Sequence, residues 1–171
     1  MSNSRKKVIV RRFTGDTLAG YLPLSSIVRG QTVVDLLDLT GRILPLVLAE
    51  IKTVSYVREF NLGDTVNPER LFRRAFLARP RNEGLWVRVT FRTGEALEGL
   101  AATDLSLLDS IQNDAGLYLV PPDTRTNTQH IFVPRTAITE LQLLAVITPR
   151  KPLVAVKQEI PRAVVIQDEL F

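Results

Sequence analysis

Residues 8–20 read VIVRRFTGDTLAG, and residues 87–99 read VRVTFRTGEALEG. Aligned without a gap, the two stretches keep an acidic residue at Asp16 and Glu95 and share several identical residues. The identical pairs are Val8/Val87, Val10/Val89, Thr14/Thr93, Gly15/Gly94, Leu18/Leu97 and Gly20/Gly99. Each copy places a strand, a glycine-containing turn and a second strand in the same order. The duplication therefore predicts two related β units in one chain.

The length of the chain allows two small domains. The 171 residues include 45% hydrophobic residues, most of them Val, Ile and Leu, which suits a β-rich core. A unit of roughly sixty residues buries only about 60% of its unfolded surface and is marginally stable alone. We therefore expect the two units to pack on each other.

Each unit is expected to contain five strands. Apolar runs and turn signals predict the first unit at residues 6–60, with strands at 8–12, 18–22, 32–37 and 43–48 and a short fifth strand from Ile51 to Tyr56. The second unit is predicted at 85–148, with strands at 86–92, 96–101, 116–120, 129–133 and 138–144.

The linker, residues 61–84, carries the clearest helix signal, at about 68–79. Asn67 suits the N-cap, Pro68 suits the first helical position, and Pro80 ends the pattern. Between them an apolar stripe at helical spacing is expected to bury the helix, and arginines occupy the rest of its surface. The stripe consists of Leu71, Phe72, Ala75, Phe76 and Leu77, and the arginines are Arg70, Arg73, Arg74 and Arg79. After the second unit, residues 149–171 contain Pro152 and Pro161, which argue against a central strand. This C-terminal arm is expected to be disordered or to dock on an edge strand of this or another chain.

The pattern of strands resembles the Sm-like fold. The resemblance is carried by residues 87–99, by Asp104 near that family's acidic position, and by residues 133–138, where the family turns into its last strand. It implies a mainly β chain of two tandem Sm-like five-stranded small barrels with a linking α-helix and an extended C-terminal arm. Sm-like units pair the fourth strand of one unit with the fifth of the next. The chain departs from the family after Asp104, where no Asn follows, and at 134–136, where Pro-Arg-Thr replaces Arg-Gly.

A second resemblance is to an uncharacterised bacterial domain that often occurs beside PilZ domains. Residues 48–60 carry it, with support from residues 15–20. That family implies no activity. A PilZ domain itself is not favoured, because Asp109 occupies the position where its motif requires glycine.

Catalytic residues are not expected. The chain has one histidine, His130, and no cysteine, so a zinc site or a thiolate nucleophile lacks its usual residues. Ser106 has no nucleophile elbow around it, and Asp104, Asp109 and Asp114 have the spacing of turn residues. We therefore expect no catalytic residue, no cofactor and no metal.

Arginines offer the best candidate binding residues. The formal net charge is +4, and arginine binds phosphate and base edges bidentately. One interpretation is a surface that binds RNA or another polyanion; the other is that these side chains are solvated or paired with acids. The candidate residues are Arg73, Arg74, Arg79, Arg81 and Arg135.

The leading functional hypothesis is a non-enzymatic binding or assembly module. Unpaired strand edges must be covered or paired, so we expect a homo-oligomer formed through strand edges that scaffolds an unknown protein partner. RNA or other nucleic-acid binding is the alternative. No apolar run approaches the roughly 18 residues of a membrane span, and Arg11 and Arg12 interrupt the apolar segment near the start, so we expect a cytoplasmic protein without a signal peptide or a membrane contact.

Overall fold

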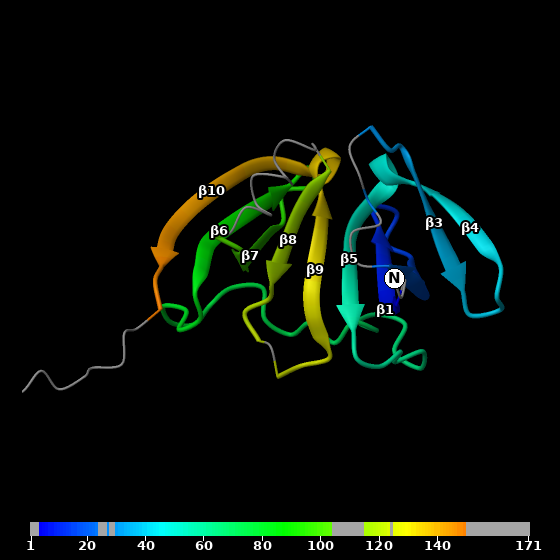
Figure 1. Ribbon diagram of the computed structural model, residues 1–171, viewed down its shortest axis with the longest axis horizontal. Coiled ribbons are helices and arrows are strands. Elements are labelled where there is room, and N and C mark those ends of the chain that lie inside the picture. The colour runs from blue at the N-terminus through cyan, green and yellow to red at the C-terminus, as the bar shows by residue number, and fades with distance from the viewer. Residues whose placement is uncertain (1–3, 24–26, 28–29, 104–114, 124, 150–171) are drawn as a thin grey trace, which may run out of the picture.

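The computed structural model describes residues 4–23, 27, 30–103, 115–123 and 125–149, and its strands form one ten-stranded antiparallel sheet (Figure 1). The first five strands are β1 (Arg5–Arg12), β2 (Thr17–Pro23), β3 (Val33–Asp38), β4 (Ile43–Val47) and β5 (Ile51–Val57). The last five are β6 (Gly84–Phe91), β7 (Ala96–Ala101), β8 (Gly116–Val120), β9 (Thr128–Pro134) and β10 (Ile138–Ile147). The predicted strands and the mainly β class are confirmed.

The order of strands in the sheet is the same in both halves. It runs β10-β6-β7-β8-β9-β5-β1-β2-β3-β4. In each half the fifth strand lies beside the first, followed by the second, third and fourth. A short 3-10 helix, η1 (Leu48–Glu50) or η2 (Arg135–Ala137), joins the fourth strand to the fifth in each half.

The repeat extends to the register of the strands. Val10 faces Val54 across β1 and β5, and the equivalent Val89 faces Leu141 across β6 and β10. The hairpin turns also agree. Gly15 N donates to Arg12 O at 3.0 Å, Gly94 N donates to Phe91 O at 2.8 Å, and both glycines have positive φ. The duplicated sequence therefore specifies a duplicated structure.

The two halves join through backbone pairing between β5 and β9. Ser55 faces Ile131, Val54 faces Phe132, and Tyr56 faces His130. The fifth strand of the first half thus pairs with the fourth strand of the second. β4 and β10 are left as the two edges of the sheet.

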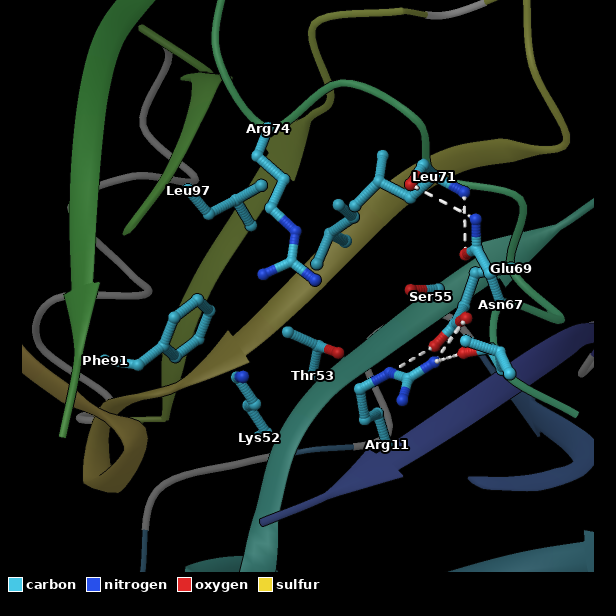
Figure 2. A pocket seen from close by; sticks show the side chains of 12 residues that line it. Arg11, Lys52, Thr53, Ser55, Asn67, Glu69, Leu71, Arg74, Phe91 and Leu97 are labelled. Atoms are coloured by element: carbon cyan, nitrogen blue, oxygen red, sulfur yellow. Dashed lines mark hydrogen bonds and ion pairs between the residues drawn. The ribbon is translucent and has the colours of Figure 1, made fainter. Parts of the chain in front are cut away.

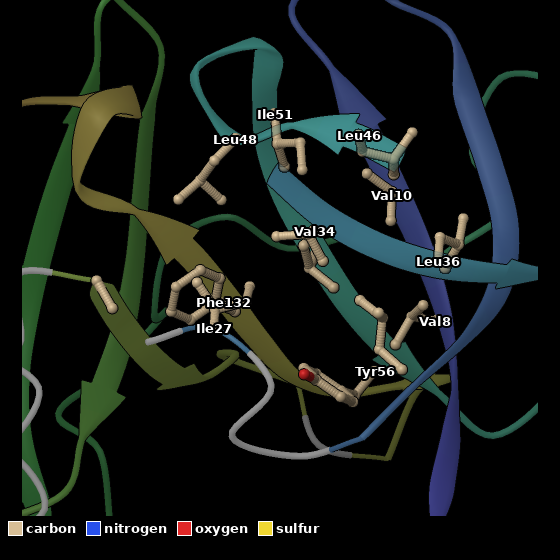
Figure 3. Packing of buried hydrophobic residues seen from close by; sticks show 13 residues of the cluster. Val8, Val10, Ile27, Val34, Leu36, Leu46, Leu48, Ile51, Tyr56 and Phe132 are labelled. Carbon is tan, nitrogen blue, oxygen red and sulfur yellow. The ribbon is translucent and has the colours of Figure 1, made fainter. Parts of the chain in front are cut away.

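Each half folds around its own hydrophobic cluster, and each cluster includes residues of the other half. Phe132 of β9, which is fully buried, belongs to the first cluster (Figure 3). Phe13 packs against the second cluster, which is built from β6, β7, β8 and β9. The expectation that the two units pack on each other is confirmed.

Two parts of the predicted architecture are wrong. The described strands form a single open sheet and not two closed barrels, because β4 does not pair with β5 and β9 does not pair with β10. The linking α-helix is also absent from the described residues, where residues 58–83 form turns, bends and segments without regular secondary structure. Asp104 and the arm from residue 150 onward lie outside the described residues.

The linker satisfies its backbone by contacts with the sheet instead of forming a helix. Arg70 has a φ of 52°, a left-handed conformation that interrupts a helix. Arg74 O accepts a hydrogen bond of 2.7 Å from Glu98 N, so this part of the linker is bonded to β7. The apolar stripe expected to bury the helix is dispersed, and Phe72 and Leu77 are exposed.

Candidate functional site

A pocket of about 360 Å³ lies where the linker crosses the sheet at the junction of the two halves (Figure 2). Strands β1 and β5 contribute from the first half, and β6, β7 and β9 contribute from the second. The lining residues are Arg11, Lys52, Thr53, Ser55, Val66, Asn67, Glu69, Leu71, Arg74, Phe91, Leu97 and Ile131. The pocket therefore exists only because both halves and the linker meet.

One end of the pocket is closed by a bidentate ion pair. Arg11 of β1 donates from Nε and Nη2 to the two carboxylate oxygens of Glu69, each at 2.8 Å (Figure 2). Glu69 is buried, and its carbonyl accepts a hydrogen bond of 2.8 Å from Thr128 Oγ1. This pair is neutral as a unit and fixes the linker against β1 and β9.

Two cations share one carboxylate at the opposite end. Lys52 of β5 and Arg74 of the linker both form ion pairs with Glu95, the latter at 3.1 Å. The Lys52 ammonium holds the pKa of Glu95 below its ordinary value, and Arg74 lowers this pKa further. Lys52 Nζ also lies 5.1 Å from the centre of the Phe91 ring. One positive charge is left over among these three groups.

Two hydroxyl groups lie on the floor of the pocket. Thr53 and Ser55 lie two positions apart on β5, so both side chains project from the same face of the sheet. Ser55 is only 2% exposed. Within the described part of the chain, neither hydroxyl has a hydrogen-bond partner, which leaves both able to bind a small polar group.

A buried carboxylate behind the pocket anchors the linker. Glu98 of β7 accepts hydrogen bonds from Phe76 N at 3.0 Å, Trp86 Nε1 at 3.1 Å and Arg88 Nη2 at 2.8 Å. Burial alone would raise the pKa of Glu98, but these donors stabilise the carboxylate and the net pKa lies below its ordinary value. Glu98 therefore fixes the position from which Arg74 reaches the pocket.

The structure brings together only some of the predicted arginines. Arg73, Arg79 and Arg81 line a shallow cleft of about 270 Å³ beside Pro121. No ion pair involves these three in the described part of the chain. Arg74 turns instead toward the Lys52 pocket, and Arg135 lies on η2 at the end of β9 remote from the linker (Figure 1).

The two free edges of the sheet carry exposed aliphatic side chains. On β4 these are Ile43, exposed by 51%, and Val47, exposed by 46%. On β10 they are Leu141, Leu143 and Val146, each exposed by more than half. Large apolar side chains at a free strand edge are characteristic of surfaces that pair with another strand.

The other residues considered from the sequence are not brought into a reactive cluster. His130 is exposed on β9 and faces Tyr56 across the β5–β9 pairing. Ser106, Asp109 and Asp114 lie outside the described residues. Across the described ranges, no group of three or more His, Cys, Asp or Glu side chains is arranged to hold a metal ion. These ranges also contain no helix with the length and apolarity to cross a membrane.

A family of unknown function, DUF6982, has a sequence model that matches residues 4–145. The chain belongs to this family. The match spans both halves and the linker, so the DUF6982 unit includes the whole ten-stranded sheet apart from the last residues of β10. No curated protein and no solved structure matches the chain. The DUF6982 description assigns no activity, and function is therefore argued from the geometry of the sheet edges and the pocket.

Sequence reasoning missed the pocket residues Lys52 and Ser55. Both lie in residues 48–60, which carry the resemblance to a bacterial domain and include the predicted fifth strand, but which gave no sign of a binding site. The one sequence signal for this pocket was the acidic residue that both repeats carry at the hairpin turn, Asp16 in the first and Glu95 in the second. In the structure they differ: Asp16 pairs with its own hairpin residue Arg12, whereas Glu95 reaches across to Lys52.

Proposed function

We propose that the chain is a non-enzymatic assembly module that joins further copies of itself through β4 and β10 and, once assembled, scaffolds a protein partner. One observation carries the proposal. The two free edges are the structural counterparts of β9 and β5, the strands that already pair at the centre of the sheet. Because the outer edges repeat the two strands that pair at the centre, further copies of the chain could pair in the same way.

The pairing of β5 with β9 within the chain predicts the register of β10 with β4 between chains. Val47 and Pro134 are equivalent because each precedes the 3-10 helix of its half, η1 or η2. Ile51 and Ile138 are equivalent because each begins the fifth strand of its half, β5 or β10. By this equivalence the facing residues Tyr56 and His130 correspond to Leu143 and Ile43. Leu143 of one copy would therefore face Ile43 of the next.

Side-chain exposure supports this register. Leu143 is 56% exposed and Ile43 is 51% exposed, and their pairing would remove both from water. Each square ångström of apolar surface buried contributes roughly 25 cal/mol. Val47 and Leu141 lie near the same contact and would add to it.

The outer edge of β4 can form backbone hydrogen bonds with an added strand, but not at every position. Leu48 N donates to Thr32 O, so Leu44 and Leu46 direct their backbone groups toward β3. Ile43, Pro45 and Val47 then face away from the sheet. Pro45 has a carbonyl but no N–H, so an added strand would lose one hydrogen bond there. We expect the contact to be reversible.

The experiment that tests this function is sizing chromatography with light scattering. Full-length protein is compared with Leu143→Lys and Ile43→Lys, which place a charge at the centre of each edge. Leu62→Lys, which changes a linker aliphatic residue of similar exposure (60%), is the matched control. We expect the native chain and the control to exceed the 19.1 kDa of one chain and the edge variants to form smaller species.

Mixing the two edge variants separates this model from nonspecific association. Each variant retains one intact edge, so the mixture should form pairs of chains while neither variant forms them alone. A native chain that elutes as a monomer at its highest soluble concentration would refute the function. Edge variants that associate as well as the control would show that other surfaces mediate assembly.

Nucleic-acid binding is the second candidate function, and the cleft lined by Arg73, Arg79 and Arg81 is the observation that favours it. Three arginines without acidic partners in the described part of the chain can bind phosphates. The same chromatography, monitored at 260 and 280 nm with and without nuclease, tests it. Nucleic acid that co-purifies with the native chain, and not with Arg79→Gln/Arg81→Gln, would favour this candidate over self-assembly.

A further inference from the structure

We propose that the pocket between the linker and the sheet binds a small organic monocarboxylate, with the carboxylate held by Lys52, Arg74 and the Ser55 hydroxyl. The site is independent of the proposed assembly, because its lining residues come from β1, β5, β6, β7, β9 and the linker and not from the edge strands β4 and β10.

The charge of the pocket selects a single negative charge. Arg11 and Glu69 neutralise each other through two hydrogen bonds of 2.8 Å. Lys52 and Arg74 share only Glu95, so the remaining balance is one positive charge. A monoanion completes that balance, whereas a dianion would bring an unpaired negative charge close to the buried Glu69.

The hydroxyl groups give the anion a defined place. Ser55 is almost completely buried, yet its side chain lines the pocket without a hydrogen-bond partner among the described residues. The hydroxyl oxygen itself remains accessible from the pocket, so a ligand can reach it. Figure 2 shows Lys52, Thr53, Ser55 and Arg74 around the same space, so one carboxylate between them would satisfy hydroxyl and cation together.

The rest of the lining selects an organic body. Leu71, Leu97 and Ile131 present aliphatic surface, and the Phe91 ring lies beside Lys52. A volume of about 360 Å³ lies at the lower end of the range for small-molecule sites. The fitting ligand has one carboxylate and a short aliphatic or aromatic body.

Glu95 is the internal competitor for this ligand. Its carboxylate pairs with both cations, and its side chain is half-exposed. An incoming carboxylate would share Lys52 and Arg74 with Glu95, and the two negative charges would repel each other. Removing the charge of Glu95 should therefore strengthen binding, an effect opposite in sign to that of removing Lys52.

The test is titration calorimetry with hexanoate and benzoate on the full chain, with hexanamide, benzamide and inorganic phosphate as comparison probes. We expect the carboxylates to bind and their amides not to bind. Lys52→Met should weaken binding about tenfold or more, since a hydrogen bond to a charged group is lost. Ser55→Ala should weaken it about threefold to tenfold. Glu95→Gln should strengthen it about twofold to fivefold.

Lys6→Met, which removes an exposed lysine of β1 outside the pocket, is the matched control and should bind as the native chain does. Thermal melting of each variant establishes that it is folded. The proposal is overturned if neither carboxylate binds the native chain or Glu95→Gln, if the amides bind equally well, or if phosphate binds more tightly than both carboxylates. Equal affinity in folded Lys52→Met and Lys6→Met would also overturn it.

Discussion

At the scale of single residues, two glycines fix the close approach of neighbouring strands. A Cβ atom on Gly20 would lie 2.5 Å from Leu37 O and 2.8 Å from two atoms of the Leu36 side chain. A Cβ atom on the equivalent Gly99 would lie 2.8 Å from Leu119 Cβ. Both positions lie where the second strand of a half meets the third, so the repeat preserves glycine because no side chain fits there.

Substitution of either glycine should destabilise the protein. We expect Gly20→Val and Gly99→Val each to lower the free energy of unfolding by about 1–3 kcal/mol, the usual cost of inserting bulk into a packed site. Urea denaturation followed by circular dichroism measures the change. Gly63→Val, at a linker position with no atom within 4 Å of the added Cβ, is the control and should unfold nearly as the native chain does.

At the scale of elements, the linker shows where sequence reasoning succeeds and where it fails. The strands were predictable because turn residues such as Gly15 and Gly94 and the alternation around them are local signals. The linker has equally good local signals for a helix, and Asn67 does accept a hydrogen bond of 3.1 Å from Leu71 N. The contacts with Glu98 and Thr128 come from distant strands, and they override the helical preference.

The pocket could not be predicted for the same reason. Lys52 and Glu95 belong to different halves, and contacts between distant parts of the chain, such as the β5–β9 pairing, bring them together. The arginine cluster shows the reverse case, in which residues that are close in sequence were expected to act together and lie at different sites. Arg74 adjoins Arg73 in sequence, but the linker is not helical and the two side chains line different clefts.

Attachment of the linker through Glu98 predicts a dependence of stability on pH. Because the folded state lowers the pKa of Glu98 below its ordinary value of 4.5, the carboxylate stabilises the fold above that pH. This contribution is lost as the pH falls through the lower pKa of the folded state. We expect the unfolding free energy of the native chain to fall on acidification below pH 4.5.

The Glu98→Gln variant isolates this contribution. At neutral pH it should be less stable than the native chain by about 1.5–3 kcal/mol, the range for hydrogen bonds to a charged group. Its loss of stability between pH 5 and pH 3, measured by urea denaturation, should be smaller than that of the native chain. Glu83→Gln, which removes an exposed linker carboxylate, is the control, and an equal flattening of its profile would argue against Glu98 as the source.

At the scale of the whole molecule, the two halves form one structural unit. The first hydrophobic cluster includes Phe132 of β9, and Phe13 of the first half packs against the second cluster. The β5–β9 ladder joins the same halves through their backbones. Units of this size are marginal alone, so each half depends on the other for part of its core.

Unfolding should therefore be a single cooperative transition. Val10 and Val89 are fully buried in the first and second clusters, respectively. We expect Val10→Ala and Val89→Ala each to destabilise the chain by about 2 kcal/mol and to shift the same transition. Calorimetry and urea denaturation, with Val66→Ala at an exposed linker position as control, check this expectation. Two transitions, each sensitive to one variant, would show that the halves unfold separately.

The proposed contact between copies joins unlike strands, β10 of one chain to β4 of the next, and this difference gives any assembly a direction. A row of copies would have two distinguishable ends, as a polar filament has. A chain with one damaged edge would still attach at the growing end and then stop further addition. A minor amount of such a chain would shorten every row that it joins, and a damaged copy would thus act dominantly over the intact protein.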